Sequence, residues 1–136
     1  MVRNLIIQIF LGEKDNLENF PIFIKNRDHW IDYCHNMGLE YLFFDKNNID
    51  DYLFDHREFY YGLEYSWQRI DFIRYLILNI EGGIYIDLDI YPNPKMDLFD
   101  LLENKYLLNY WTNKSNNKEI NNALMGFELG DLTTLI

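Results

Sequence analysis

The sequence is poor in several residue types that often define the class of a protein. Cys34 is the only cysteine among 136 residues, so an internal disulfide is impossible and a reducing compartment is expected. Lysine and arginine total 12 against 22 aspartates and glutamates, which gives a formal net charge of −10. Binding to the phosphate backbone of DNA or RNA needs a basic face. The composition therefore argues against a nucleic-acid partner.

Long apolar runs are absent as well. No stretch approaches the roughly 20 apolar residues of a membrane-spanning helix. The apolar run at residues 5–11 is too short for a signal peptide and is followed by charged residues. We therefore expect a soluble, cytoplasmic protein. Apolar and aromatic side chains are plentiful, at 49% and 18% of the chain, and predict a single domain with its own core over residues 1–136.

Apolar periodicity divides the chain into alternating strands and helices. The predicted strands are residues 4–11, 39–44, 84–90, 105–110 and 123–128; the predicted helices are residues 17–37 and 66–79, with short helices within 45–65 and 96–102. Pro21 falls in the first turn of one helix, Gly38 follows its end, and Ser66 is placed to cap the next one. This alternation predicts an α/β fold with a largely parallel sheet.

The central stretch, residues 67–92, carries the groups most suited to chemistry. Asp71 and Arg74 lie three apart on the predicted helix and so share a face. After a Gly-Gly turn, Asp87 and Asp89 alternate on the predicted strand, so both side chains are expected on one side. Ligands of parallel sheets bind where the strands end. The set suits a metal ion, a diphosphate and sugar hydroxyls.

The pattern of this stretch, D..RY..L...GGIY.D.D, resembles the DXD-motif glycosyltransferases of family 32. That group includes yeast-type mannosyltransferases, and the glucosylating domain of large clostridial toxins is similar to it. The matching residues are Asp71, Arg74, Tyr75, Leu78, Gly82, Gly83, Ile84, Tyr85, Asp87 and Asp89. The segment RNLIIQIFLG resembles the first strand of the family, I-I-H-Q-I-W, with Ile7 and Phe10 replacing His and Trp. Asn122-Ala123 is similar to a downstream NA segment, so the resemblance spans roughly residues 3–128.

The resemblance implies a GT-A fold, which is a Rossmann-like, mostly parallel sheet flanked by helices. It implies a metal-dependent hexosyltransferase that moves a hexose or N-acetylhexosamine with retention of the anomeric configuration. The donor would be a nucleotide-sugar, with a UDP-sugar favoured over GDP-mannose, and the acceptor an unknown glycan or protein. The chain would be a short member that lacks the C-terminal part of longer relatives, where the family has another metal ligand and much of the acceptor site.

The resemblance also implies roles for residues that would bind the donor. Phe10 would stack on the nucleobase, less extensively than Trp, and backbone groups near Ile9 would read the edge of the base. Asp71 and Arg74 would hold hydroxyls of the donor sugar. Tyr85 would support the donor.

Three further residues would surround the metal and the diphosphate. Asp89 would ligate Mn²⁺ or Mg²⁺ directly, Asp87 would contact the ribose and a metal-bound water, and Asn122 would lie near the donor sugar or diphosphate. Both ions prefer carboxylate oxygens and usually keep several waters, so one or two aspartates suffice. A divalent ion stabilises the charge of the departing diphosphate without proton transfer, so no general base is assigned.

Two other functions stay open on sequence grounds. Haloacid-dehalogenase-like phosphatases also have an apolar strand ending in D-x-D, with Asp87 as the nucleophile, although that motif normally opens the domain. A non-catalytic nucleotide-sugar-binding module would fit the short C-terminus and Phe10. Structural explanations are open too: Phe10, Tyr85 and Trp67 as packing residues, although Trp67 could also wall the donor site. The aromatic segment at residues 59–61 suits a homo-oligomer contact.

Overall fold

The computed structural model describes residues 2–95, 97–98, 106–112, 114–116 and 118–128. The strands are β1 (Leu5–Ile9), β2 (Glu40–Phe44), β3 (Gly83–Ile86), β4 (Tyr106–Thr112) and β5 (Lys118–Phe127). The helices are η1 (Leu17–Asn19), α1 (Pro21–Met37), α2 (Asp50–Leu53), η2 (Phe54–His56), α3 (Arg57–Gly62) and α4 (Ser66–Glu81).

Within the described part of the chain, five strands form one sheet in the order β2-β1-β3-β5-β4. β1 pairs in parallel with both β2 and β3, whereas β5 pairs antiparallel with β3 and with β4. β4 therefore runs in the same direction as β3, and among these five strands only β5 runs in the opposite direction. The expected α/β fold of GT-A type, with a mostly parallel sheet flanked by helices, is confirmed.

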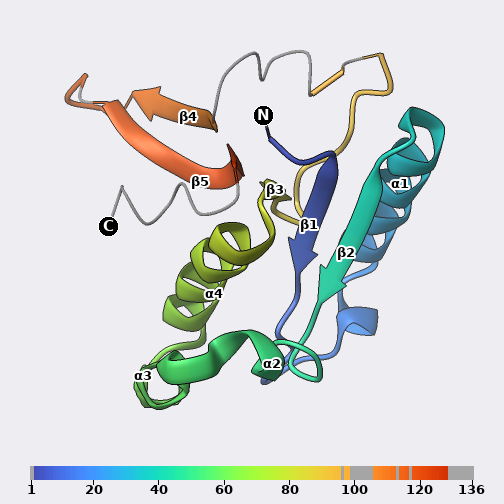
Figure 1. The fold of residues 1–136 in the computed structure, drawn as a ribbon. Coiled ribbons are helices and arrows are strands. Elements are labelled where there is room, and N and C mark those ends of the chain that lie inside the picture. The colour runs from blue at the N-terminus through green and yellow to red at the C-terminus, as the bar shows by residue number, and fades with distance from the viewer. Residues whose placement is uncertain (1, 96, 99–105, 113, 117, 129–136) are drawn as a thin grey trace.

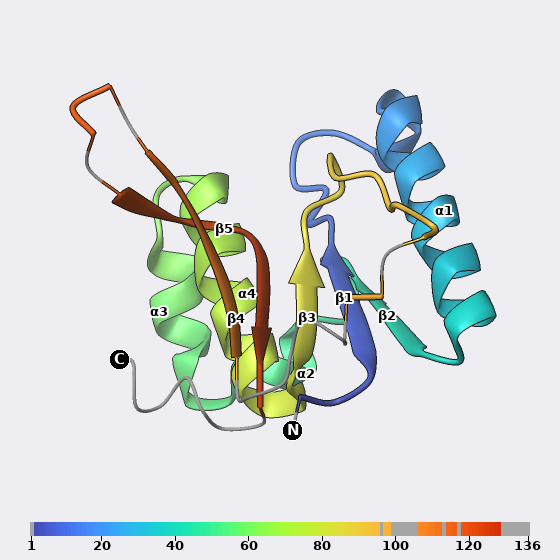
Figure 2. The ribbon, with the colours of Figure 1, turned by 90° about the horizontal axis from the view of Figure 1, so that it is seen from above.

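The sheet lies between two layers of helix. α1 covers one face, and α4 with the short helices α2 and α3 covers the other (Figures 1 and 2). Leu5, Ile7 and Ile9 of β1 join the core that contains the buried residues of α4. Ile6, between them in sequence, joins the core beneath α1. Burial on both faces explains why this strand is a continuous apolar run, since alternate side chains point to opposite sides.

The helix boundaries follow local signals, with one exception. α1 begins at Pro21 and ends before Gly38, whose φ of 69° is left-handed, as the sequence predicts. Ser66, predicted as the N-cap of α4, is instead its first helical residue, and Tyr65 is the N-cap. The backbone N–H of Tyr65 donates to the Gln68 side chain at 3.0 Å. That bond starts the helix one residue earlier than expected.

Gly83 lets β3 approach β1 closely. Its φ is +100°, and a Cβ at this position would lie 2.7 Å from the backbone oxygen of Leu5. Any other residue would both strain the backbone and push the two strands apart. The Gly-Gly turn therefore does more than end α4, because it also sets the spacing of the parallel strands beside the candidate site.

β3 is shorter than the predicted strand 84–90, and this corrects the expected placement of Asp87 and Asp89. The Asp87 N–H donates to the Ala123 carbonyl at 2.7 Å, but the Ile90 N–H then donates back to the Asp87 carbonyl at 3.1 Å. The chain turns at this point. Both aspartates lie in a turn beyond the strand, so the prediction that they alternate along it is wrong.

The remaining predicted elements agree in kind but differ in extent. Short helices occupy residues 45–65 as expected. β5 starts five residues before the predicted strand 123–128, at the end of the predicted loop 113–118. The predicted helix 96–102 lies largely outside the described residues. None of the described helices combines the length and the apolar character needed to cross a bilayer.

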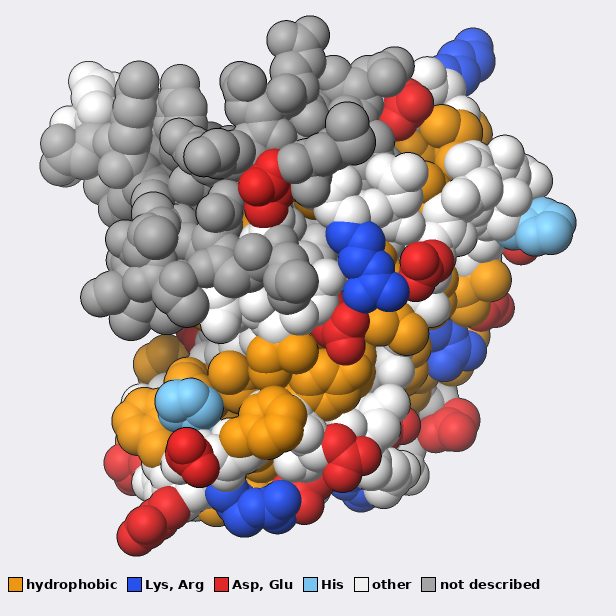
Figure 3. Space-filling model, in the orientation of Figure 1, with side chains coloured by type: hydrophobic (Ala, Val, Ile, Leu, Met, Phe, Trp, Pro, Cys, Tyr) orange, Lys and Arg blue, Asp and Glu red, His pale blue; other side chains and the backbone are white. Residues whose placement is uncertain are grey.

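Aromatic side chains gather on the face formed by η2 and α3. Figure 3 shows hydrophobic side chains across the lower part of the visible face, where Figure 1 places α2 and α3. Phe54, Phe59 and Tyr61 are more than half exposed, whereas Tyr60 is buried in the core. Of the aromatic segment expected to meet a partner, Phe59 and Tyr61 are therefore available at the surface.

Cys34 offers a direct test of the packing beneath α1. It is buried, and burial raises the pKa of its thiol to about 12 from the ordinary 9.0. The thiolate is the reactive form, so at pH 8 the native protein should react with a disulfide reagent about a thousandfold more slowly than the denatured chain. Thiol titration with and without guanidinium measures the ratio. Similar rates in both states would contradict this packing.

Candidate functional site

A cavity of about 180 Å³ opens at the carboxyl ends of β1 and β3. Its lining residues are Ile9, Phe10, Phe23, Ile70, Tyr85, Asp87, Leu88 and Asp89. The cavity thus joins the end of the first strand to the turn that carries both aspartates. Asp89 is exposed and Asp87 half-buried, so neither carboxylate is walled off in the core.

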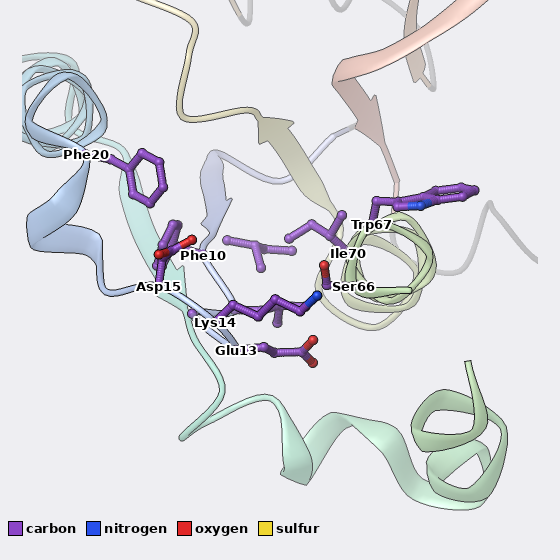
Figure 4. Close-up of a pocket in the computed structure, with 11 residues that line it drawn as sticks. Phe10, Glu13, Lys14, Asp15, Phe20, Ser66, Trp67 and Ile70 are labelled. Atoms are coloured by element: carbon purple, nitrogen blue, oxygen red, sulfur yellow. The ribbon is translucent and has the colours of Figure 1, made fainter. Parts of the chain in front are cut away.

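A second cavity, of about 290 Å³, adjoins the first and shares Ile9, Phe10 and Ile70 with it. Figure 4 shows Phe10, Lys14 and Ile70 around this hollow. Phe10 is half-buried and lines both cavities, with its ring centre 5.8 Å from that of Phe20. It is therefore not a core residue. Trp67 also lines this second cavity, although its ring points away from the hollow (Figure 4) and the residue is 61% exposed.

Arg74 is the centre of a polar cluster beside the cavity. Its side chain is only 6% exposed. Nη1 donates to the backbone oxygen of Asn122 at 2.8 Å, and Nη2 lies 3.5 Å from Asp71 Oδ1 and 3.4 Å from Asp87 Oδ1. The guanidinium carbon sits 4.6 Å from the centre of the Tyr85 ring. Asp71 and Arg74 therefore do not form an ordinary surface ion pair, because the arginine is buried and bridges two acids.

Asp87 is held from two sides. The Tyr85 hydroxyl donates a hydrogen bond to Asp87 Oδ1, and Arg74 approaches the same oxygen. Burial raises the pKa of Asp87 above its ordinary value; the tyrosine and the arginine oppose that shift, while Asp89 and Asp71 add to it. Burial also raises the pKa of Tyr85 well above 10, so the hydroxyl stays protonated and can donate this hydrogen bond. A cation beside Asp87 would relieve the charge that burial disfavours.

β5 connects the helix-borne pair to the turn after β3. The Asn122 amide donates to Asp71 Oδ1 at 3.3 Å, while its backbone oxygen accepts from Arg74. The next residue, Ala123, accepts the Asp87 N–H. Two successive residues of β5 therefore contact both parts of the cluster, the helix pair and the aspartate in the turn after β3.

The donor set suits a divalent ion that shares its coordination with a ligand. Asp87 and Asp89 line one cavity and supply carboxylate oxygens. Among the described residues, no group of three or more His, Cys, Asp or Glu side chains is arranged to hold a metal. Mg²⁺ and Mn²⁺ are often held by one or two carboxylates together with substrate phosphates. The two aspartates fit that arrangement better than an all-protein cage.

The structure brings the predicted site residues together in two adjoining groups. The cavity holds Ile9, Phe10, Tyr85, Asp87 and Asp89, and the cluster around the arginine holds Asp71, Arg74, Tyr85, Asp87 and Asn122. Sequence reasoning missed Phe23, Ile70 and Leu88 as cavity walls. Phe23 and Ile70 lie near the N-terminal ends of α1 and α4, close to the strand tips, and that position was the available signal.

Comparison with known proteins identifies the family of this chain. A family model described as "Glycosyltransferase sugar-binding region containing DXD motif" matches residues 14–120. Over 73 residues, 52% of this chain, the sequence is 37% identical to inositol phosphoceramide mannosyltransferase 3 of Schizosaccharomyces pombe. The chain spans 18% of the length of that relative. Because the matched region includes Asp71, Arg74, Asp87 and Asp89 and covers most of the chain, this protein belongs to the DXD-motif glycosyltransferase family.

Proposed function

We propose that the chain binds a nucleotide-sugar and transfers its hexose or N-acetylhexosamine to a glycan or protein acceptor, with a divalent metal ion and with retention of configuration. The observation that supports this most is the cavity in which Ile9 and Phe10 meet Asp87 and Asp89. An aromatic wall and a pair of carboxylates in one cavity offer separate places for a base and for a metal-bound diphosphate.

In this proposal the nucleotide lies along the end of β1. Phe10 stacks on the base, since its ring is half-buried and lines both cavities. The backbone around Ile9 reads the edge of the base. We favour a UDP-sugar on family analogy, with GDP-mannose as the second choice. The S. pombe relative is named as a mannosyltransferase, which is an argument for that second choice.

The sugar lies towards α4. Asp71, whose side chain is 44% exposed, accepts hydrogen bonds from sugar hydroxyls. Arg74 is proposed to hold hydroxyls with it, but burial leaves little of the guanidinium for a ligand. Its larger contribution is to keep Asp71 and Asp87 in place. The amide of Asn122 orients Asp71 from the other side.

Asp89 and Asp87 hold Mn²⁺ or Mg²⁺ in this proposal. When bound, such an ion stabilises the negative charge that develops on the departing diphosphate. The Tyr85 hydroxyl donates a hydrogen bond to Asp87 and so keeps that carboxylate oriented towards the cavity. The contacts of Arg74 with both Asp71 and Asp87 also account for the two helix residues that the phosphatase alternative leaves unexplained.

Calorimetry with UDP and Mn²⁺, followed by an assay of donor hydrolysis, tests the proposal. We expect UDP to bind only when the metal is present, and the UDP-sugar to turn over. Absence of any metal-dependent binding to UDP or GDP would reject it. Binding of the intact donor with neither hydrolysis nor transfer would favour the non-catalytic module.

Phe10→Ala should weaken UDP binding roughly tenfold. Stacking of a base on an aromatic side chain contributes about 1–3 kcal/mol, and alanine removes the stacking surface. Titration of UDP at saturating Mn²⁺ measures the effect. Phe59→Ala is the matched control, because it removes an exposed phenylalanine from α3. Equal affinities of Phe10→Ala and the wild type would place the base elsewhere.

A further inference from the structure

The turn that carries Asp89 lies beyond the last residue of β3. Its own backbone bond joins the Ile90 N–H to the Asp87 carbonyl at 3.1 Å, and Asp89 itself is exposed. A short exposed turn tends to move more than the sheet that it follows. A metal ligand at that position needs support from elsewhere in the fold.

That support comes from α1. The Asn26 side-chain N–H donates to the Leu88 carbonyl, and the Trp30 indole N–H donates to the Ile90 carbonyl, both at 2.8 Å. Asn26 and Trp30 are four residues apart and so share one face of the helix. Each is 3% exposed. Water cannot easily replace a bond lost at such a buried position, so both contacts constrain the turn strongly.

The same helix face holds the chain beyond the turn. The His29 and Tyr91 rings are 4.7 Å apart, and the Leu98 N–H donates to the Tyr33 hydroxyl at 3.2 Å. Figure 2 shows the segment after β3 passing over to α1. The contacts at Asn26 and Trp30 reach the aspartate turn itself, whereas the contact at Tyr33 lies several residues beyond it.

Peptide geometry carries the effect of these bonds to the aspartates. The Leu88 carbonyl belongs to the same planar unit as the N–H of Asp89, so a hydrogen bond that holds this carbonyl also orients the backbone from which Asp89 projects. The hydrogen bond from Trp30 to the Ile90 carbonyl holds the next peptide unit but one along the chain in the same way. Neither Asn26 nor Trp30 is among the described residues that line the cavity with the aspartates.

We propose that Asn26 and Trp30 are positioning residues of the metal site, which act on Asp87 and Asp89 only through the backbone of the turn. The proposal rests on the proposed function for the identity of the ligand, a divalent ion. It assigns α1, on the opposite face of the sheet from α4, a part in ligand affinity. Groups behind metal ligands commonly change metal affinity by 10–100-fold when they are lost.

The test uses Asn26→Leu and Trp30→Phe, each of which removes the hydrogen-bond donor and leaves an apolar side chain: a branched one at residue 26 and an aromatic ring at residue 30. Tyr33→Phe is the matched control, since it removes a hydrogen bond from the same helix face at Leu98. In the protein without ligands, amide exchange at Ile90 should be at least tenfold faster in both variants and unchanged in the control. Mn²⁺ affinity in the presence of UDP, followed by electron paramagnetic resonance, should fall roughly tenfold in both and stay unchanged in the control.

The two measurements separate this proposal from the proposed function. Exchange at Ile90 needs no ligand, so faster exchange in both variants supports the role of α1 even if the wild type binds no Mn²⁺, which would instead reject the proposed function. Unchanged exchange at Ile90 overturns the positioning role. Faster exchange with unchanged Mn²⁺ affinity also overturns it, because the bonds would then be structural only. Trp30→Phe keeps the packing ring and decides the question if Asn26→Leu does not fold.

Discussion

Asp89→Ala is expected to lower donor turnover with Mn²⁺ by about a thousandfold and to leave the thermal stability of the protein nearly unchanged. Loss of the direct metal ligand removes charge stabilisation at the departing diphosphate, which contributes several kcal/mol; about 4 kcal/mol corresponds to a thousandfold in rate. Asp89 is exposed, and substitutions of exposed residues usually change stability by about 0.5 kcal/mol or less. Asp89→Ala should therefore lose turnover without losing thermal stability.

Two measurements check this expectation: turnover of a nucleotide-sugar at saturating metal, and Mn²⁺ affinity in the presence of UDP. Asp28→Ala is the matched control, since it removes an aspartate whose side chain is 61% exposed on α1. The control should keep wild-type turnover and wild-type Mn²⁺ affinity. If Asp89→Ala also kept both, the aspartate turn would not be the metal site.

Arg74→Met should lower the free energy of unfolding by about 3 kcal/mol and the melting temperature by about 10 °C. Methionine keeps much of the length of the side chain but loses the bond to the Asn122 carbonyl and both ion pairs. Removal of one partner from a buried pair usually costs about 3–5 kcal/mol. We take the lower end, because the Asp71 and Asp87 side chains are 44% and 28% exposed and solvent screens them.

The loss of unfolding free energy in Arg74→Met should depend on pH in a defined direction. Burial raises the pKa of Asp87 above its ordinary value of 3.8, so the folded state binds this proton more tightly than the unfolded chain does. The ionised carboxylate therefore reduces stability as the pH rises above about 4. Arg74 opposes that shift, so its removal should raise the pKa of Asp87 further. Stability should then fall over a wider range of pH. The stability gap between Arg74→Met and the wild type should be largest near pH 7 and smaller near pH 4.

Denaturant unfolding at the two pH values measures this gap. Arg69→Met is the matched control on the same helix, because Arg69 pairs with Glu13 at 2.9 Å but its side chain is 22% exposed. We expect a loss of about 1 kcal/mol there. A loss for Arg74→Met no larger than that of the control would mean that the arginine is not the centre of the cluster.

Local patterns were enough to predict most of the elements. The alternation of short apolar runs with stretches of helical spacing predicts an α/β fold with a largely parallel sheet. Pro21 and Gly38 mark the ends of α1, because each favours one backbone geometry. The spacing of Asp71, Arg74, Asp87 and Asp89 already indicated the family. These signals come from residues close to one another in the sequence, where side-chain and backbone preferences act directly.

Where each side chain lies in the candidate site was decided by contacts between distant parts of the chain. β3 ends before the aspartates because the Ile90 N–H bonds to the Asp87 carbonyl and not to a neighbouring strand. α1 holds that turn from some 60 residues away in sequence. Arg74 is buried because β5, 48 residues further on, places the Asn122 carbonyl against it. Periodicity describes which face of an element is apolar, but not which distant residue will meet it. That information arises only when the layers pack.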